Sequence, residues 1–287
     1  DTTNNQNIVF NNNVTADTFT TAAQGYDIFL LGDATFANAV TFQNTGTLDL
    51  GNATSDTFTF NGGVTENTSG TVTIDGAIVS SNDAISFGNI LLGQNLSMTS
   101  AGGAISIGTI SPASGTHDVT ITSSGGSANT VAVGAISAVN TVAITSGTLT
   151  TLNGNITTDN SSGNSVTLVG TTTNGANITI DTNNTNNDGA INIASFSSSN
   201  NNLALDSGTA EITLSGATFN LGSGSLTTTG DINLAANVSI TATGGMTIND
   251  KIDADSASSN DRTLTLNSGT GATMTFNDAI GSTEALA

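Results

Sequence analysis

Acidic side chains are the most numerous groups in this sequence that could take part in catalysis. The chain has 22 Asp and Glu residues. Several follow short apolar alternations, near the ends of expected strands: Asp75, Asp159, Asp181, Asp206 and Asp231. Two carboxyl groups about 5–10 Å apart could hydrolyse a glycosidic bond. Asp is also an ordinary turn-forming residue, and 4% aromatic residues without Trp is little for a sugar-binding groove. We therefore interpret these residues as turn formers.

Other catalytic residue types are scarce. His117 is the only histidine, and it stands in an expected loop, SPASGTHDVT (111–120). A Ser-His-Asp triad would have to use it, and the adjacent Asp118 is poorly placed to orient it. Lys251 and Arg262 are the only cations, which leaves little for lyase chemistry, and no phosphate-binding or dinucleotide motif is present. The sequence predicts a chain that is not an enzyme, with no catalytic residue and no organic cofactor.

Calcium is the one ion for which the loops offer ligands. Residues 182–190 and 249–261 are rich in Asn, Asp and Ser oxygens. Neither segment matches an EF-hand loop or the calcium-binding nonapeptide repeat. Cysteine is absent, so a thiolate metal site is excluded. The candidate calcium ligands are Asp181, Asp188, Asp253 and Asp255.

The elements that must position all of these side chains are short strands in which apolar and polar residues alternate. The starts of these strands recur at a nearly constant spacing in the sequence. One series of strand starts is Val72, Leu96, Val119, Val142, Val166 and Ile191. A second series is Ile85, Ile105, Val131, Leu152, Ile178 and Leu203. Regular repeats of this kind are typical of solenoids. They predict an all-β parallel β-helix of about 23–24 residues per coil, with a β-sandwich as the alternative.

The corners between strands repeat as well. They read apolar, then Asn, Asp or Gly, then Ile or Val, as in FNGGV (60–64), LNGNI (152–156) and INDKI (248–252). Asn, Asp and Gly tolerate the backbone of a sharp bend. Stacked corners should form ladders in which each Asn amide bonds to the next.

Composition divides the chain into two regions. Residues 1–65 hold most of the Phe residues, and we expect an N-terminal β region of entry coils or an assembly interface; residues 66–287 should form regular solenoid coils. Solenoid ends present unpaired edges that need a cap or a partner. The segment YDIFLLG (26–32) is the most hydrophobic stretch. Tyr26, Phe29, Leu31 and Leu286 are therefore the candidate residues for end-to-end self-association.

The charge of the chain restricts its partners. Its formal net charge is −20, which should repel nucleic acid and anionic lipid. The apolar runs are much shorter than the ~20 residues of a membrane helix. We expect neither nucleic-acid binding nor membrane insertion.

Several sequence segments resemble those of very large bacterial surface proteins built from β-strand repeats. They are AVTFQNTGTLDLGN (39–52), TFTFNGGVT (57–65) and MTFNDAIGSTEALA (274–287). They are similar to filamentous-haemagglutinin-like adhesins and autotransporter passenger domains. The resemblance implies a right-handed β-helix outside the cell, acting in adhesion, aggregation or biofilm matrix, with surface glycans or other cells as partners.

Two alternatives to this non-catalytic role stay open. One is a carbohydrate-active β-helix enzyme that uses a pair of Asp residues. The other is an ice- or surface-binding solenoid, suggested by Thr-x-Thr pairs such as Thr57/Thr59 and Thr263/Thr265, although these pairs do not recur in each coil.

Overall fold

The structure is a computed structural model that describes residues 6–68, 70–126, 129–159, 163–184, 188–198, 200–255 and 262–286. These residues form 32 β-strands and no helix. The chain divides into two compact units. Unit 1 comprises Asp1–Val139 and Ile144–Thr148, and unit 2 comprises Asn140–Ala143 and Leu149–Ala287. The compositional boundary expected near residue 65 stays a prediction.

The strands of the first half are β1 (Asn7–Phe10), β2 (Val14–Ala16), β3 (Asp27–Leu30), β4 (Ala34–Phe36), β5 (Val40–Phe42), β6 (Leu48–Leu50), β7 (Thr57–Phe60), β8 (Val64–Glu66), β9 (Val72–Ser80), β10 (Ile85–Phe87), β11 (Ile90–Ser100), β12 (Ile105–Ile107), β13 (Ile110–Pro112), β14 (Asp118–Ser123), β15 (Thr130–Val133), β16 (Ile136–Val139) and β17 (Thr141–Ser146). Those of the second half are β18 (Leu149–Leu152), β19 (Ile156–Asp159), β20 (Asn164–Asn174), β21 (Ile178–Asn184), β22 (Ala190–Ser197), β23 (Leu203–Asp206), β24 (Ile212–Leu214), β25 (Thr218–Asn220), β26 (Leu226–Thr229), β27 (Ile232–Leu234), β28 (Val238–Thr241), β29 (Met246–Ile248), β30 (Ile252–Ala254), β31 (Leu264–Asn267) and β32 (Met274–Phe276).

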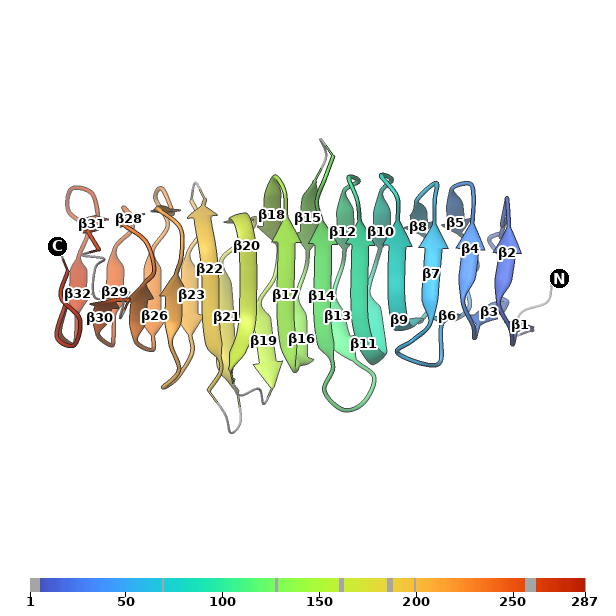
Figure 1. Cartoon of the computed structure of the whole chain (residues 1–287), viewed down its shortest axis with the longest axis horizontal. Coiled ribbons are helices and arrows are strands. Elements are labelled where there is room, and N and C mark those ends of the chain that lie inside the picture. The colour runs from blue at the N-terminus through green and yellow to red at the C-terminus, as the bar shows by residue number, and fades with distance from the viewer. Residues whose placement is uncertain are drawn as a thin grey trace. The chain divides into compact units, whose positions relative to one another are not determined.

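Unit 1 is a parallel β-solenoid. Strands of consecutive coils pair in parallel along rows such as β1–β3–β6–β9 and β5–β8–β10–β12–β15, and Figure 1 shows them side by side. The length of a coil follows from the register. Ile85 pairs with Ile105, whereas Leu48 pairs with Val72, so the second of these coils is the longer one. The strands keep their register while the corners absorb insertions.

Unit 2 repeats the same architecture. Its rows include β19–β21–β23–β26–β29–β32 and β22–β24–β27–β30, again parallel. A short coil leads from Ile212 to its partner Ile232, and a long one leads from Met246 to its partner Met274. The all-β parallel solenoid predicted from the repeat is confirmed. The expected coil length, which is an average over the repeat, lies between these short and long coils.

Alternation along each strand builds the core. In β9, residues 72, 74, 76, 78 and 80 are buried and those between them are partly exposed. The core is mostly Val, Ile and Leu, and each such side chain contributes about 1.5–3 kcal/mol when buried. Phenylalanines take over in the coils of residues 10–60, where the rings of Phe36 and Phe60 stack with centroids 5.5 Å apart and Phe42 packs edge-on against Phe60.

Asn and Asp side chains connect one coil to the next at the corners. In each case the residue lies just before the first core residue of a strand, and its side-chain oxygen accepts the N–H of the equivalent residue one coil later. We call this contact the inter-coil clamp. Asn177 accepts the N–H of Asn202 at 2.9 Å, and Asn202 accepts that of Ser225 at 2.9 Å. The same clamp is made by Asn13, Asp27, Asp33, Asn89, Asn95, Asn155 and Asn237.

The ladders of Asn amides bonded to one another, which the sequence predicted, are therefore mostly replaced by bonds from a backbone N–H to a side-chain oxygen. A direct amide-to-amide bond is described between Asn277 Nδ2 and Asn249 Oδ1, at 2.8 Å. At the clamps, the acceptor satisfies a backbone N–H of the following coil, which would otherwise lack a partner at the corner.

Candidate functional site

A polar hollow of about 280 Å³ opens on the side of unit 2. It is lined by Glu211, Asp231, Ile232, Asn233, Lys251, Asp253, Ala254, Thr283 and Glu284. The register of the coils explains why these residues meet. Ile212, Ile232 and Ile252 stack in the core, so the residues that precede them stack at the corner: Glu211, Asp231 and Lys251.

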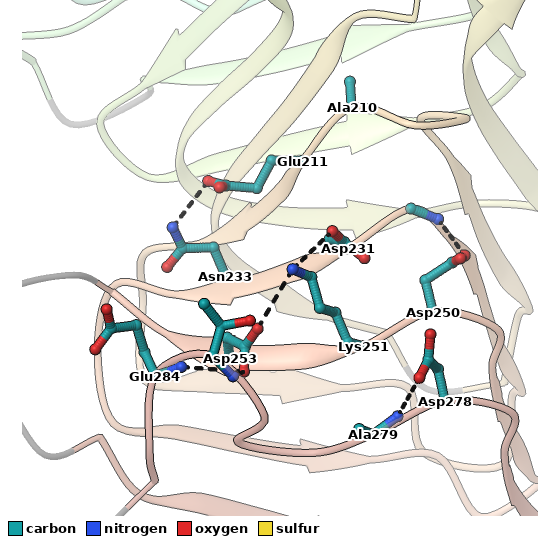
Figure 2. A network of polar contacts seen from close by, with 12 residues as sticks. Ala210, Glu211, Asp231, Asn233, Asp250, Lys251, Asp253, Asp278, Ala279 and Glu284 are labelled. Atoms are coloured by element: carbon teal, nitrogen blue, oxygen red, sulfur yellow. Dashed lines mark hydrogen bonds and ion pairs between the residues drawn. The ribbon is translucent and has the colours of Figure 1, made fainter.

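Lys251 is the centre of this hollow (Figure 2). Its Nζ lies 3.3 Å from Asp231 Oδ2 and 3.7 Å from Asp253 Oδ2. Mainly through its hydrogen bond to Asp231, these contacts raise the pKa of Lys251. The ammonium group thus separates carboxylates that would otherwise repel one another across adjacent strands.

Asp253 is held from two sides. Its Oδ1 accepts the N–H groups of Thr283, at 3.0 Å, and Glu284, at 3.4 Å, while Oδ2 faces Lys251. Burial by itself raises the pKa of Asp253, but the backbone donors and Lys251 outweigh it and the pKa is lowered. A general acid or base works best with a pKa near the operating pH, so this carboxylate is suited to an ion pair and poorly suited to proton transfer.

The rest of the network orders amide and carboxylate groups. Glu211 Oε1 accepts a hydrogen bond from Asn233 Nδ2 at 2.9 Å (Figure 2). It also accepts one from Thr213 Oγ1 at 2.8 Å. Nearby, Asp250 accepts the N–H of Gly230 at 2.8 Å, and Asp278 accepts the N–H of Ala279 at 2.7 Å. Asp278 acts on the backbone of its own corner, as turn formers do, whereas Asp250 connects its corner to the preceding coil.

The candidate calcium ligands lie at several separate points of unit 2. Asp255 pairs with Arg262, whose hydrogen bond lowers the pKa of Asp255. Asp188 accepts the N–H and the hydroxyl of Thr209, which lower its pKa in the same way. Within the described residues there is no group of three or more His, Cys, Asp or Glu side chains that could hold a metal ion. Residues 185–187 and 256–261 of the two candidate loops lie outside the described residues, and calcium binding stays a prediction.

Asp181 and Asp206 occupy the same position on adjacent coils. Their backbones pair in register within the row β19–β21–β23–β26. Each carboxylate accepts a local backbone N–H: Asp181 that of Asn183 at 2.9 Å, and Asp206 that of Gly208 at 3.1 Å. These bonds stabilise turns at the ends of the strands.

The candidate assembly residues are found in different environments. Tyr26 is 5% exposed, and its hydroxyl accepts the N–H of Ala22 at 2.7 Å, so it packs inside its own coil. Phe29, Leu31 and Leu286 are partly exposed. Phe29 pairs in register with Val9, which is 44% exposed, on the outer side of β1 and β3. Their role in self-association stays a prediction.

Asp49 and Asp75 form a second cluster, in unit 1, that the sequence did not reveal as a pair. Asp49 lies on β6 and Asp75 on β9, one coil apart. Burial, and then the charge of Asp75, raises the pKa of Asp49 to about 6. Asp75 also has a raised pKa, chiefly because of burial. His117, the residue a catalytic triad would need, closes its own loop by a 2.9 Å contact between Nε2 and the carbonyl oxygen of Ser114.

No protein-family model matches the sequence, and neither a curated protein nor a solved structure is significantly similar to it. No helix that could cross a membrane occurs in the described part of the chain. Of what the resemblance to β-strand-repeat surface proteins implies, the structure confirms the parallel β-solenoid.

Proposed function

We propose that the protein is a non-catalytic structural and adhesive element of the bacterial cell surface or extracellular matrix. One observation carries this proposal: each unit has a row of small, uncharged polar side chains on the outer face of consecutive coils. In unit 1, Thr41, Thr65, Ser86 and Ser106 stack in register. In unit 2, Thr227, Thr247 and Thr275 do the same.

Such rows suit weak, repeated contacts. Consecutive coils are about 4.8 Å apart, so the hydroxyl groups recur at a short, fixed spacing. Each hydroxyl both donates and accepts hydrogen bonds, and many weak contacts made together give high avidity. Hydroxyl-rich surfaces, such as surface glycans of other cells, are the partners with matching chemistry.

The proposal is tested by adhesion of beads coated with the whole chain to bacterial cells and to immobilised polysaccharides. We expect several-fold more retained beads than with an albumin coat. A triple variant, Thr41→Val, Thr65→Val and Ser86→Ala, removes three of the four hydroxyl groups of the unit 1 row and should lower retention. Its control, Ser114→Ala with Thr116→Val, removes loop hydroxyls and should not. Retention equal to that of albumin would reject an adhesive role.

Self-association end to end is part of the proposal. Negative-stain microscopy at increasing protein concentration should show filaments. Single short particles at every concentration would reject polymerisation and leave adhesion untouched.

A carbohydrate-active enzyme is the second candidate, and the Asp49–Asp75 pair is the observation that favours it. Hydrolysis of a glycosidic bond uses two carboxyl groups, one of them a general acid with a raised pKa and the other an ionised base or nucleophile. Here, however, the Oδ1 atoms of both residues are buried, which supports a non-catalytic role. A polysaccharide screen should detect no product; product release that disappears in Asp49→Asn would favour the enzyme instead.

A further inference from the structure

A narrow slot between three coils of unit 1 holds the side chain of Asp75. Leu50, Ile74 and Leu92 pair in register, so the residues that follow them stack: Gly51, Asp75 and Gly93. A Cβ atom at Gly51 would lie 2.0 Å from the carbonyl oxygen of Asp75, and one at Gly93 would lie 2.1 Å from its Oδ1. Only glycine leaves room on either side, and we call this arrangement the Asp75 slot.

The strand after the slot is irregular where it meets the carboxylate. The register between β9 and β11 shifts between Leu92 and Leu96. This bulge brings the N–H groups of Gly93 and Gln94 close enough to Asp75 to oppose the effect of burial on its pKa. The slot therefore contains a carboxylate that is only partly compensated.

Asp49 completes the cluster from the preceding coil. It lies on the same outer face, just ahead of Leu50 and Gly51. Asp49 Oδ1 and Asp75 Oδ1 are both buried, and neither makes a hydrogen bond within the described structure. A buried acceptor without a hydrogen-bond donor destabilises the folded state, and two neighbouring carboxylates that cannot both ionise easily are known to share one proton.

Two further titratable groups act on the charge of Asp75. His117, from the loop before β14, acts on Asp75 as a positive charge, and Asp56, from the loop before β7, acts as a negative one. Asp49 is affected by burial and by Asp75. The balance of these influences raises the pKa of both carboxyl groups.

We propose that Asp49 and Asp75 bind one shared proton in acidic surroundings and act as a latch between consecutive coils of unit 1. The proton comes from solvent and resides on Asp49, whose new O–H donates to a carboxylate oxygen of Asp75. An O–H bond of a solvent hydronium ion breaks and the O–H bond of Asp49 forms; one hydrogen bond is gained, one repulsion disappears, and no bond between heavy atoms changes.

The direction of the effect follows from linkage. Folded Asp49 titrates at about 6, whereas its ordinary pKa is 3.8. Between these values the folded state binds more protons than the unfolded state, so stability rises as the pH falls. Near pH 5 the unfolding equilibrium constant should be smaller by up to about tenfold than near pH 7.5, on account of this group alone.

Two measurements on the whole chain test the latch. The first is a ¹³C NMR titration of the Asp carboxyl groups. In the native protein, Asp49 should titrate near pH 6, and in Asp75→Asn its midpoint should fall because the neighbouring charge is gone. An Asp49 midpoint near 4 would overturn the proposal. A midpoint that is unchanged in Asp75→Asn would overturn the shared proton.

The second measurement is urea unfolding near pH 7.5 and near pH 5. Since the chain is strongly acidic, acidification should stabilise it in general, so a matched control is needed. Asp17→Asn removes one charge from an exposed position in the same unit. Between about pH 7.5 and pH 5, the unfolding equilibrium constant of Asp17→Asn should change as much as that of the native chain. In Asp49→Asn this change should be smaller by up to about tenfold. Equal responses of the two variants would refute the latch; if Asp49→Asn does not fold, the NMR titration decides.

Discussion

Removing the side-chain oxygen of Asn177 should loosen one junction between coils of unit 2. In the native chain this oxygen accepts the N–H of Asn202 at 2.9 Å, a normal length for a strong bond. The substitution Asn177→Ala deletes the acceptor and leaves the N–H of Asn202 without its partner. A net loss of about 1 kcal/mol is expected for one such bond.

Asn202 takes part in two consecutive clamps, and this allows a sharper test of their contribution to stability. Asn202 both donates to Asn177 and accepts the N–H of Ser225, also at 2.9 Å. Asn202→Ala should therefore cost about 1 kcal/mol as well, since its backbone N–H still reaches Asn177. The double variant should lose about 2 kcal/mol, because the two side chains act on different N–H groups. Asn153→Ala, at an exposed side-chain amide that makes no hydrogen bond to another described residue, should change stability by less than about 0.5 kcal/mol.

Hydrogen exchange gives the local readout that a global unfolding curve cannot. In Asn177→Ala the amide of Asn202 should exchange about fivefold faster or more, in line with the loss of about 1 kcal/mol. The amide of Ser225 should be nearly unaffected. Urea unfolding followed by far-UV circular dichroism measures the global change. If the Asn202 amide exchanges as slowly in Asn177→Ala as in the native chain, the clamp is not what holds this corner.

Other substitutions test the core, the slot and the hollow. Phe42→Ala removes a fully buried ring and should cost about 3–5 kcal/mol, measured by urea unfolding. Gly93→Ala places a methyl group against the Asp75 carboxylate and should lower the urea midpoint, whereas an unchanged midpoint would mean that the slot can widen. Thr172→Val removes a buried hydroxyl that has no partner in the described structure and should stabilise the chain by up to about 1 kcal/mol; clear destabilisation would reveal a hidden partner. Because the pKa of Asp253 is lowered, its ionised form contributes to folding stability above about pH 4, and this contribution is lost on further acidification. In urea unfolding, Asp253→Asn should therefore lose less stability on acidification than the native chain, an effect opposite in sign to that of Asp49→Asn.

The fold was predictable because the alternation of apolar and polar residues within each short strand recurs along the sequence. Leu96 and Met98 alternate with polar neighbours, and the same alternation returns one coil later at Val119 and Ile121. The exact coil length was less predictable, since corners accept extra residues without disturbing the register of the strands. The step from Met246 on β29 to Met274 on β32 is unusually long for this reason.

The polar clusters were not predictable, because each depends on register between coils. Nothing in the sequence relates Asp49 to Asp75; they meet because Leu50 pairs with Ile74. Lys251 likewise reaches Asp231 only because Ile232 pairs with Ile252. For Asp231 and Lys251 a signal was available in hindsight, since residues at equal offsets from paired core positions face the same corner. Asp49 and Asp75 do not follow this rule, because Asp49 precedes Leu50 whereas Asp75 follows Ile74. Applying this rule requires the register, which a variable coil length conceals.

The inter-coil clamp also explains why the same three-residue pattern recurs in the sequence. A clamp needs Asn or Asp at the corner, the next residue enters the core, and the one after it points outward. The result is a triplet of Asn, an aliphatic residue and Ser or Thr, as at Asn95, Asn155, Asn177 and Asn237. These triplets have the form of glycosylation signals, yet here the Asn oxygen is already used in stacking. The first two positions are constrained by the solenoid and the third is free to vary among small polar residues. Under the adhesive function proposed above, substitutions at the third position would change the outer rows, and hence adhesion, without altering the core that keeps the coils together.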